Sequence, residues 1–139
     1  MRSPHYLVFL TQDPHGFWVF GAAAAKAREK WLEFLGADSV ATEYMLPIEL
    51  VDPVADQIKR EHAAAIGCVT DNLRRLTEDG QPKTVVKHVS EIFGDLYGEA
   101  KEVAFTAALR TLVNSGEIEY VTKGSKPHKH VIRKAQALS

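Results

Sequence analysis

The stretch AALRTLVNSGEIEYVT, residues 107–122, decides how the second half of this chain is expected to fold. Leu109 and Leu112 stand three residues apart, as on the inward face of a helix. A Ser-Gly pair at 115–116 interrupts this pattern, and glycine readily adopts the positive φ that ends a helix. In residues 117–122 apolar and polar side chains alternate, which is typical of a half-buried strand. The sequence therefore predicts a helix that turns directly into a strand.

The residues on either side extend this pattern into a larger unit. Apolar spacing predicts helices, alternation predicts strands, and Gly80 and Gly98 mark breaks between them. The expected order is a long helix (residues 54–78), a short strand (83–86), two helices (86–97 and 100–114), a strand (117–122), a loop (123–129) and a final strand (130–134). This is the order of a winged helix-turn-helix domain, in which the third helix and the hairpin loop contact the ligand. We expect this domain over about residues 69–134.

The first third of the chain is expected to form a strand-helix unit. Residues 5–11 are rich in β-formers and predict a strand, and residues 13–16, DPHG, predict a turn. A helix is expected over residues 17–35, ended by Gly36, with residues 37–53 as a connection. Its apolar stripe consists of Phe17, Phe20, Ala24, Ala27, Trp31 and Phe34.

Taken together, these patterns predict an α+β, mainly helical protein. The N-terminal strand-helix unit and its linker occupy residues 1–53. The long helix and the winged-helix domain occupy residues 54–139.

Two separated segments resemble the C-terminal part of the three-Cys-motif partner family, whose members have a methyltransferase-like body followed by a winged helix. They are YLVFLTQDPHG, residues 6–16, and AALRTLVNSGEI, residues 107–118. The chain departs from the family because it has no glycine-rich turn for a methyl donor, and 139 residues do not hold both a nucleotide-binding sheet and a winged helix. No catalytic residue is carried over. The resemblance implies a detached tail that acts as a binding module, such as one reused by a virus or mobile element.

Charge is distributed unevenly along the chain, although the net charge is only −1. Residues 122–139 hold five basic and no acidic side chains, while the other 121 residues hold 12 basic and 18 acidic ones. An acidic body with a basic end indicates nucleic acid or another acidic partner. A solvated tail without a partner is the alternative.

Nucleic-acid binding makes the most use of these residues. Arginine pairs with guanine or phosphate, asparagine pairs with adenine, and lysines neutralise phosphates. Glu99 and Glu102 count against it, because carboxylates repel phosphates. The expected contacts on the third helix and the wing are Lys101, Thr106, Arg110, Asn114, Lys123, Ser125, Lys126, Lys129, His130 and Arg133. We therefore expect a non-enzymatic protein that binds duplex DNA rather than RNA, a regulator acting as a homodimer.

The alternative function is a protein-interaction module, such as an adaptor or an inhibitor of a nucleoprotein complex. Its expected interface is the aromatic part of the first predicted helix: Phe17, Phe20, Trp31 and Phe34. Exposed aromatic clusters are common anchors of interfaces, including those of homodimers. The same stripe would also serve as ordinary core between the two halves of the chain.

No catalytic or metal site is expected. His128 and His130 share one side of an extended segment, but no third ligand follows at a diagnostic spacing. The lone Cys68 excludes an internal disulfide and a cysteine-based zinc site. Asp13, two residues before His15, is better explained as a helix cap than as half of an acid-base pair. With no apolar run of membrane-spanning length, we expect a cytoplasmic protein without cofactor, metal or membrane contact.

Overall fold

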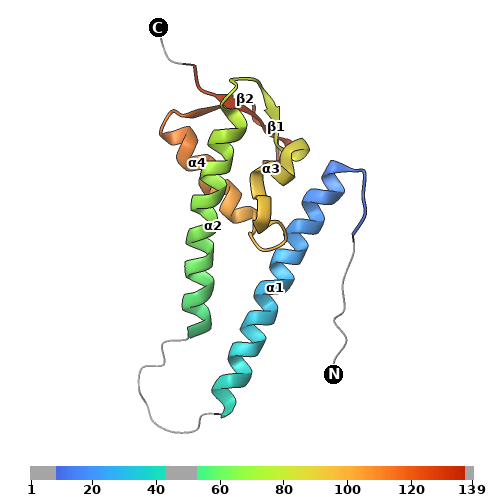
Figure 1. Cartoon of the computed structure of the whole chain (residues 1–139), viewed down its shortest axis with the longest axis vertical. Coiled ribbons are helices and arrows are strands. Elements are labelled where there is room, and N and C mark those ends of the chain that lie inside the picture. The colour runs from blue at the N-terminus through green and yellow to red at the C-terminus, as the bar shows by residue number, and fades with distance from the viewer. Residues whose placement is uncertain (1–8, 43–52, 137–139) are drawn as a thin grey trace.

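The computed structural model describes residues 9–42 and 53–136, which form a mainly helical α+β structure with a small antiparallel sheet (Figure 1). Two long helices, α1 (Pro14–Thr42) and α2 (Pro53–Thr77), extend from a compact head (Figure 1). The head contains, in chain order, β1 (Lys83–Thr84), the 3-10 turn η1 (Val85–His88), α3 (Val89–Phe93), the 3-10 turn η2 (Gly94–Leu96), α4 (Glu102–Asn114), β2 (Ile118–Thr122), the 3-10 turn η3 (Pro127–Lys129) and β3 (Val131–Lys134). The expectation of an α+β, mainly helical chain is confirmed.

The turn from α4 into β2 forms as the sequence predicts. Gly116 has φ 74°, a conformation that L side chains rarely adopt. Its N–H donates to the carbonyl of Val113 at 3.1 Å, and the N–H of Glu117 donates to the carbonyl of Leu112 at 2.9 Å. These two bonds form a Schellman motif, which satisfies the last carbonyls of α4 and directs the chain into the sheet.

The three strands lie in the order β1-β3-β2, and both pairings are antiparallel. In the hairpin, Tyr120 pairs with Ile132, but the next pair is Thr122 with Val131. Val121 is therefore an extra residue on β2, a β-bulge that bends the hairpin. The sheet buries Ile118 and Ile132 against the helices of the head.

Trp18 joins α1 to the core of the head. Its side chain is 4% exposed, and its ring lies edge-on to Phe93 at 5.5 Å and to Phe105 at 5.3 Å, measured between centroids. The other members of this cluster include Val69, Leu73, Val85, Val89, Ile92, Ala104, Ala108, Leu109, Leu112, Ile118 and Ile132. One hydrophobic core therefore takes side chains from α1, α2 and the whole head.

The start of α1 confirms one expectation and corrects another. The Asp13 carboxylate accepts hydrogen bonds from the N–H groups of His15 and Gly16 at 3.1 and 3.2 Å, as a helix cap does. The expected turn at 13–16 is the first turn of the helix itself, because proline is well tolerated at the first helical position. Of the expected strand, residues 5–8 lie outside the described residues and residues 9–11 are not in a strand.

Gly36 does not end α1, which continues to Thr42. A Cβ atom at Gly36 would lie 2.6 Å from Cγ2 of Val54, so glycine is needed here for the close approach of α1 and α2. The two helices meet at this point and diverge toward the head (Figure 1). α2 also contains a glycine, Gly67, and runs unbroken through it.

The predicted helix over residues 86–97 is divided into η1, α3 and η2. Gly94 has φ 52° at the end of α3, which interrupts the helical backbone. The segment that follows places Tyr97 against α1, where its hydroxyl donates to the carbonyl of Phe17 at 2.6 Å. No helix in the described ranges is both long and apolar enough to cross a membrane.

Candidate functional site

The tip of the β2–β3 hairpin, residues 123–130, is a closed and ordered loop. The N–H of Gly124 donates to Nδ1 of His130 at 3.0 Å, and η3 adds main-chain hydrogen bonds. A Cβ atom at Gly124 would lie 2.5 to 2.8 Å from side-chain and main-chain atoms of Lys129. The two sides of the loop are therefore in direct contact, and the side chains on the tip project from a fixed backbone.

His128 anchors this tip to α1. It is 6% exposed, and its ring centroid lies 4.7 Å from that of His15 and 5.9 Å from that of Trp18. Its Nε2 is buried without a hydrogen-bond partner among the described residues. Burial lowers the pKa of His128, with smaller lowering effects from His15, Lys129 and Lys126, while Glu102 raises it. The neutral imidazole is thus favoured at this contact.

His130, an expected nucleic-acid contact, faces the interior of the hairpin instead. It is 9% exposed, and it meets the Tyr120 ring edge-on at 5.0 Å. Burial lowers its pKa, and Lys123 and His128 lower it further. This residue stabilises the tip from within, because its ring nitrogen accepts the Gly124 N–H.

Positive charge is in excess around the hairpin and α4. Residues 103–136 contain six basic and two acidic side chains. Both acids are already paired: Glu117 with Arg74 at 2.7 Å, and Glu119 with Arg133 at 2.6 Å. Arg133 is therefore paired with its cross-strand neighbour in this structure.

The expected contacts on α4 also divide into two groups. Lys101 pairs with Glu29 of α1 at 2.5 Å, and Thr106 donates to the carbonyl of Glu102 at 3.1 Å; both are half-buried. They belong to the junction of α1 and α4. The residues of the expected set that are exposed are Arg110, Asn114, Lys123, Ser125, Lys126 and Lys129.

The aromatic stripe of α1 is divided in the same way. Phe17 stacks on Tyr97 at 4.2 Å and Phe20 stacks on Phe9 at 4.1 Å, and both are half-buried. Trp31 and Phe34 are each 60% exposed and lie 5.7 Å apart. Only the second half of the predicted stripe is thus available to a partner.

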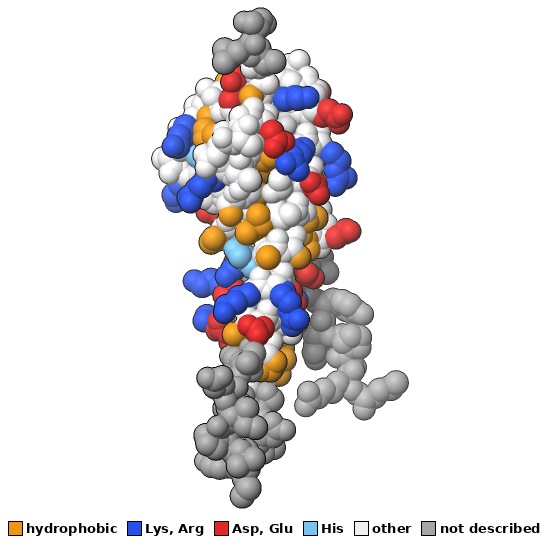
Figure 2. All heavy atoms as spheres, turned by 90° about the vertical axis from the view of Figure 1, so that its left-hand side faces the viewer, with side chains coloured by type: hydrophobic (Ala, Val, Ile, Leu, Met, Phe, Trp, Pro, Cys, Tyr) orange, Lys and Arg blue, Asp and Glu red, His pale blue; other side chains and the backbone are white. Residues whose placement is uncertain are grey.

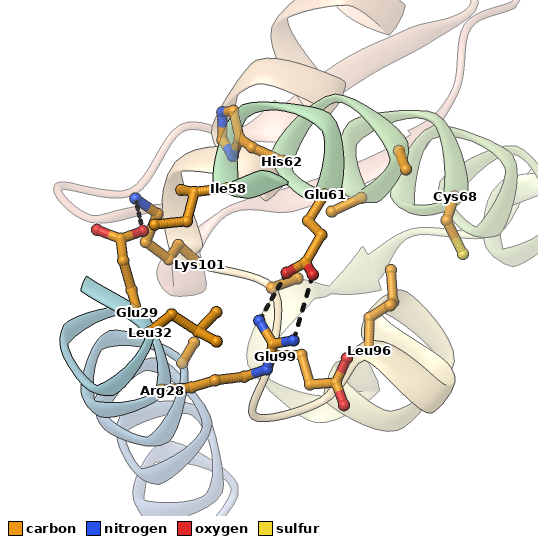
Figure 3. Close-up of a pocket in the computed structure, with 14 residues that line it drawn as sticks. Arg28, Glu29, Leu32, Ile58, Glu61, His62, Cys68, Leu96, Glu99 and Lys101 are labelled. Carbon is orange, nitrogen blue, oxygen red and sulfur yellow. Dashed lines mark hydrogen bonds and ion pairs between the residues drawn. The ribbon is translucent and has the colours of Figure 1, made fainter. Parts of the chain in front are cut away.

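A cleft of about 380 Å³ lies between α1, α2 and the segment that leads into α4 (Figure 3). Arg28 of α1 crosses to Glu61 of α2, with N–O distances of 2.7 and 3.5 Å. This hydrogen-bonded pair raises the pKa of Arg28 and lowers that of Glu61. Sequence reasoning missed the cleft, because its walls come from three separate segments and no local motif marks it.

Three further findings concern the surface around α2, metal binding and similarity to known proteins. Figure 2 shows the face that carries α2, where a belt of hydrophobic side chains lies between charged regions above and below it. No group of three or more His, Cys, Asp or Glu side chains spaced to hold a metal ion occurs in residues 9–42 and 53–136. No family model, curated protein or solved structure matches this chain.

Proposed function

We propose that residues 69–134 form a winged-helix domain that binds duplex DNA as a non-enzymatic regulator. The order α2, β1, α3, α4, β2, β3 and the sheet order β1-β3-β2 both support this assignment. In such a domain α4 enters the major groove, and the hairpin tip contacts the sugar-phosphate backbone.

The hairpin tip is the observation that carries the proposal. Lys123, Lys126 and Lys129 are exposed on a loop whose backbone is closed by the Gly124–His130 hydrogen bond and whose underside is anchored by His128. Because the backbone of this loop is already ordered, it loses little conformational entropy when the loop meets a polyanion. Each phosphate that they neutralise also releases condensed counterions, which favours binding.

The exposed side of α4 supplies groups suited to base edges. Val103, Arg110 and Asn114 are exposed, and their spacing of seven and four residues places them on one face. Arginine pairs with guanine, asparagine pairs with adenine, and an apolar side chain contacts the thymine methyl group. Val103 is 61% exposed, and a DNA base would cover this otherwise solvated side chain.

Fluorescence anisotropy with a labelled duplex tests this proposal. We expect the triple variant Lys123→Ala, Lys126→Ala, Lys129→Ala to lose about tenfold or more in affinity. The matched control removes three exposed cations from the long helices: Lys26→Ala, Lys59→Ala, Arg60→Ala. Equal losses in the two variants, with unchanged thermal unfolding, would contradict a hairpin contact.

A second candidate function is self-association through the second half of α1. The exposed pair Trp31 and Phe34, with Leu35 at 46% exposure, favours it. A two-fold pairing of this helix face with a second copy would cover all three side chains. Sedimentation of the wild type and of Trp31→Ala/Phe34→Ala tests it: a wild-type dimer that the variant converts to monomer supports self-association, and a monomeric wild type contradicts it.

A further inference from the structure

The cleft in Figure 3 has the size and lining of a small-molecule site. Its volume, about 380 Å³, falls within the range of ligand pockets in proteins. Its apolar wall consists of Ala25, Leu32, Ile58, Ala64, Ala65, Leu96 and Ala100. Apolar walls with a few placed charges are the usual lining of such pockets.

Among the described charged side chains that line the cleft, one carboxylate is not in an ion pair. Arg28 is paired with Glu61, and Lys101 is paired with Glu29. The carboxylate of Glu99 has no hydrogen bond or ion pair to any residue that the structure describes. It lies beside Arg28, with which it interacts electrostatically, and beside Leu96 at the edge of the cleft (Figure 3). His62 lies on the α2 side of the cleft, away from the Arg28–Glu61 pair (Figure 3).

The arrangement of these charges favours a cationic ligand over an anionic one. An anion would have to displace Glu61 from Arg28 or Glu29 from Lys101, and it would meet Glu99 as well. A cation can pair with Glu99, the one cleft carboxylate that makes no hydrogen bond or ion pair among the described residues, and it leaves both existing ion pairs intact. An apolar body would cover the alanine and leucine side chains that line the walls.

We infer that this cleft binds a small organic cation: an apolar, ring-sized body that carries one ammonium group. The ammonium pairs with Glu99, and the body lies between α1 and α2. Because the lining ends at Lys101, the residue before α4, the ligand contacts the segment that positions this helix. The inference does not require DNA binding, since the ligand itself is what is measured.

Three probes that share an indole ring but differ in charge test the inference: tryptamine, the smaller neutral 3-methylindole and the anionic indole-3-propionate. Titration calorimetry of the full chain with each probe gives its Kd. We expect tryptamine to bind with a Kd of about 0.1–1 mM, an ordinary affinity for a ligand of this size. The neutral probe should bind more weakly, and the anionic probe most weakly.

Two variants locate the site. Glu99→Gln removes the exposed carboxylate and should weaken tryptamine binding about fivefold, as loss of an exposed ion pair does. Ala64→Phe places a ring in the cleft from an exposed position of α2 and should abolish binding. Glu78→Gln, an exposed carboxylate just beyond the end of α2 and outside the cleft lining, is the matched control and should bind as the wild type does.

The contrary results are equally defined. Absence of saturable tryptamine binding, equal binding of the three probes, or an unchanged Kd in either Glu99→Gln or Ala64→Phe would overturn the inference. Tighter binding of the anionic probe would assign the cleft to an acidic ligand instead, and would overturn it too.

Discussion

The indole N–H of Trp18 donates a hydrogen bond of 2.7 Å to the carboxylate of Glu102, which stands in the first turn of α4. The bond satisfies the polar atom of a buried tryptophan, and it places a negative charge where a helix N-terminus favours one. Lys101, the residue before α4, makes a second contact with α1 through Glu29. α1 is therefore a structural part of the head, and it helps to fix the position of α4.

The two tryptophans should differ sharply in their effect on stability. Trp18→Ala removes a side chain that is 4% exposed from the core, and we expect it to lower the free energy of unfolding by about 3–5 kcal/mol. Trp31→Ala changes a side chain that is 60% exposed, and should cost about 0.5 kcal/mol or less. Urea unfolding followed by circular dichroism measures both values. Similar losses for the two variants would contradict this assignment of the core.

Two glycines in the long helices should respond to alanine in opposite directions. A Cβ atom at Gly21 would lie 2.5 Å from Cε2 of Tyr97, whose ring is held by stacking on Phe17. Gly21→Ala should therefore destabilise the protein by about 1–3 kcal/mol. At Gly67 a Cβ atom would meet nothing within 4 Å, so Gly67→Ala should stabilise by about 0.5–1 kcal/mol. Thermal unfolding of both variants tests the pair, and a shift in the same direction would be the contrary result.

Stability should fall as the solution is acidified. Burial lowers the pKa of His128 and of His130 below the ordinary value of 6.5. As pH falls below that value, the unfolded chain takes up protons that the folded chain still resists, so the free energy of unfolding decreases. His128→Phe removes one of these groups and should make the decrease shallower. The check is the Tm of both proteins between about pH 7.5 and pH 5.5, and parallel curves would count against a neutral His128 contact.

The parts of the fold that depend on local chemistry were predictable from sequence. The Leu109 and Leu112 spacing, followed by Gly116, requires only neighbouring residues to specify a helix, a turn and a strand. Asp13 as a helix cap is predictable for the same reason. The prediction of exposed cations at Lys123, Lys126 and Lys129 also holds, because an unpaired lysine ammonium is costly to bury.

The wrong predictions concern residues whose local sequence is compatible with two structures, so that tertiary contacts decide which one forms. α1 has large apolar side chains on several sides, and only contact with Phe93 and Phe105 selects Trp18 as the inward one. A stripe through Trp18, Ala25 and Leu32, at seven-residue spacing, was the signal that could have indicated this. A glycine such as Gly36 can end a helix or allow two helices to pack closely. The contact with Val54 shows that Gly36 serves close packing.

The expected role of His130 was wrong, and the cleft was missed, for similar reasons. His130 fits the alternating pattern of the predicted strand, but that pattern does not show that its side chain points inward. The inward direction follows from the closed loop around Gly124. Arg28 and Glu61 are 33 positions apart, so their ion pair and the cleft depend on how α1 and α2 cross. No spacing in the sequence predicts that geometry.

The salt dependence of duplex DNA binding tests the central claim most directly. For the wild type, log K should fall with log salt concentration with a slope of about −4, and the Lys123→Ala, Lys126→Ala, Lys129→Ala variant should have a slope about three units shallower. The Lys26→Ala, Lys59→Ala, Arg60→Ala control should keep the wild-type slope. A wild type that does not bind duplex DNA, or a hairpin variant whose slope equals that of the wild type, would contradict a DNA contact made by this hairpin.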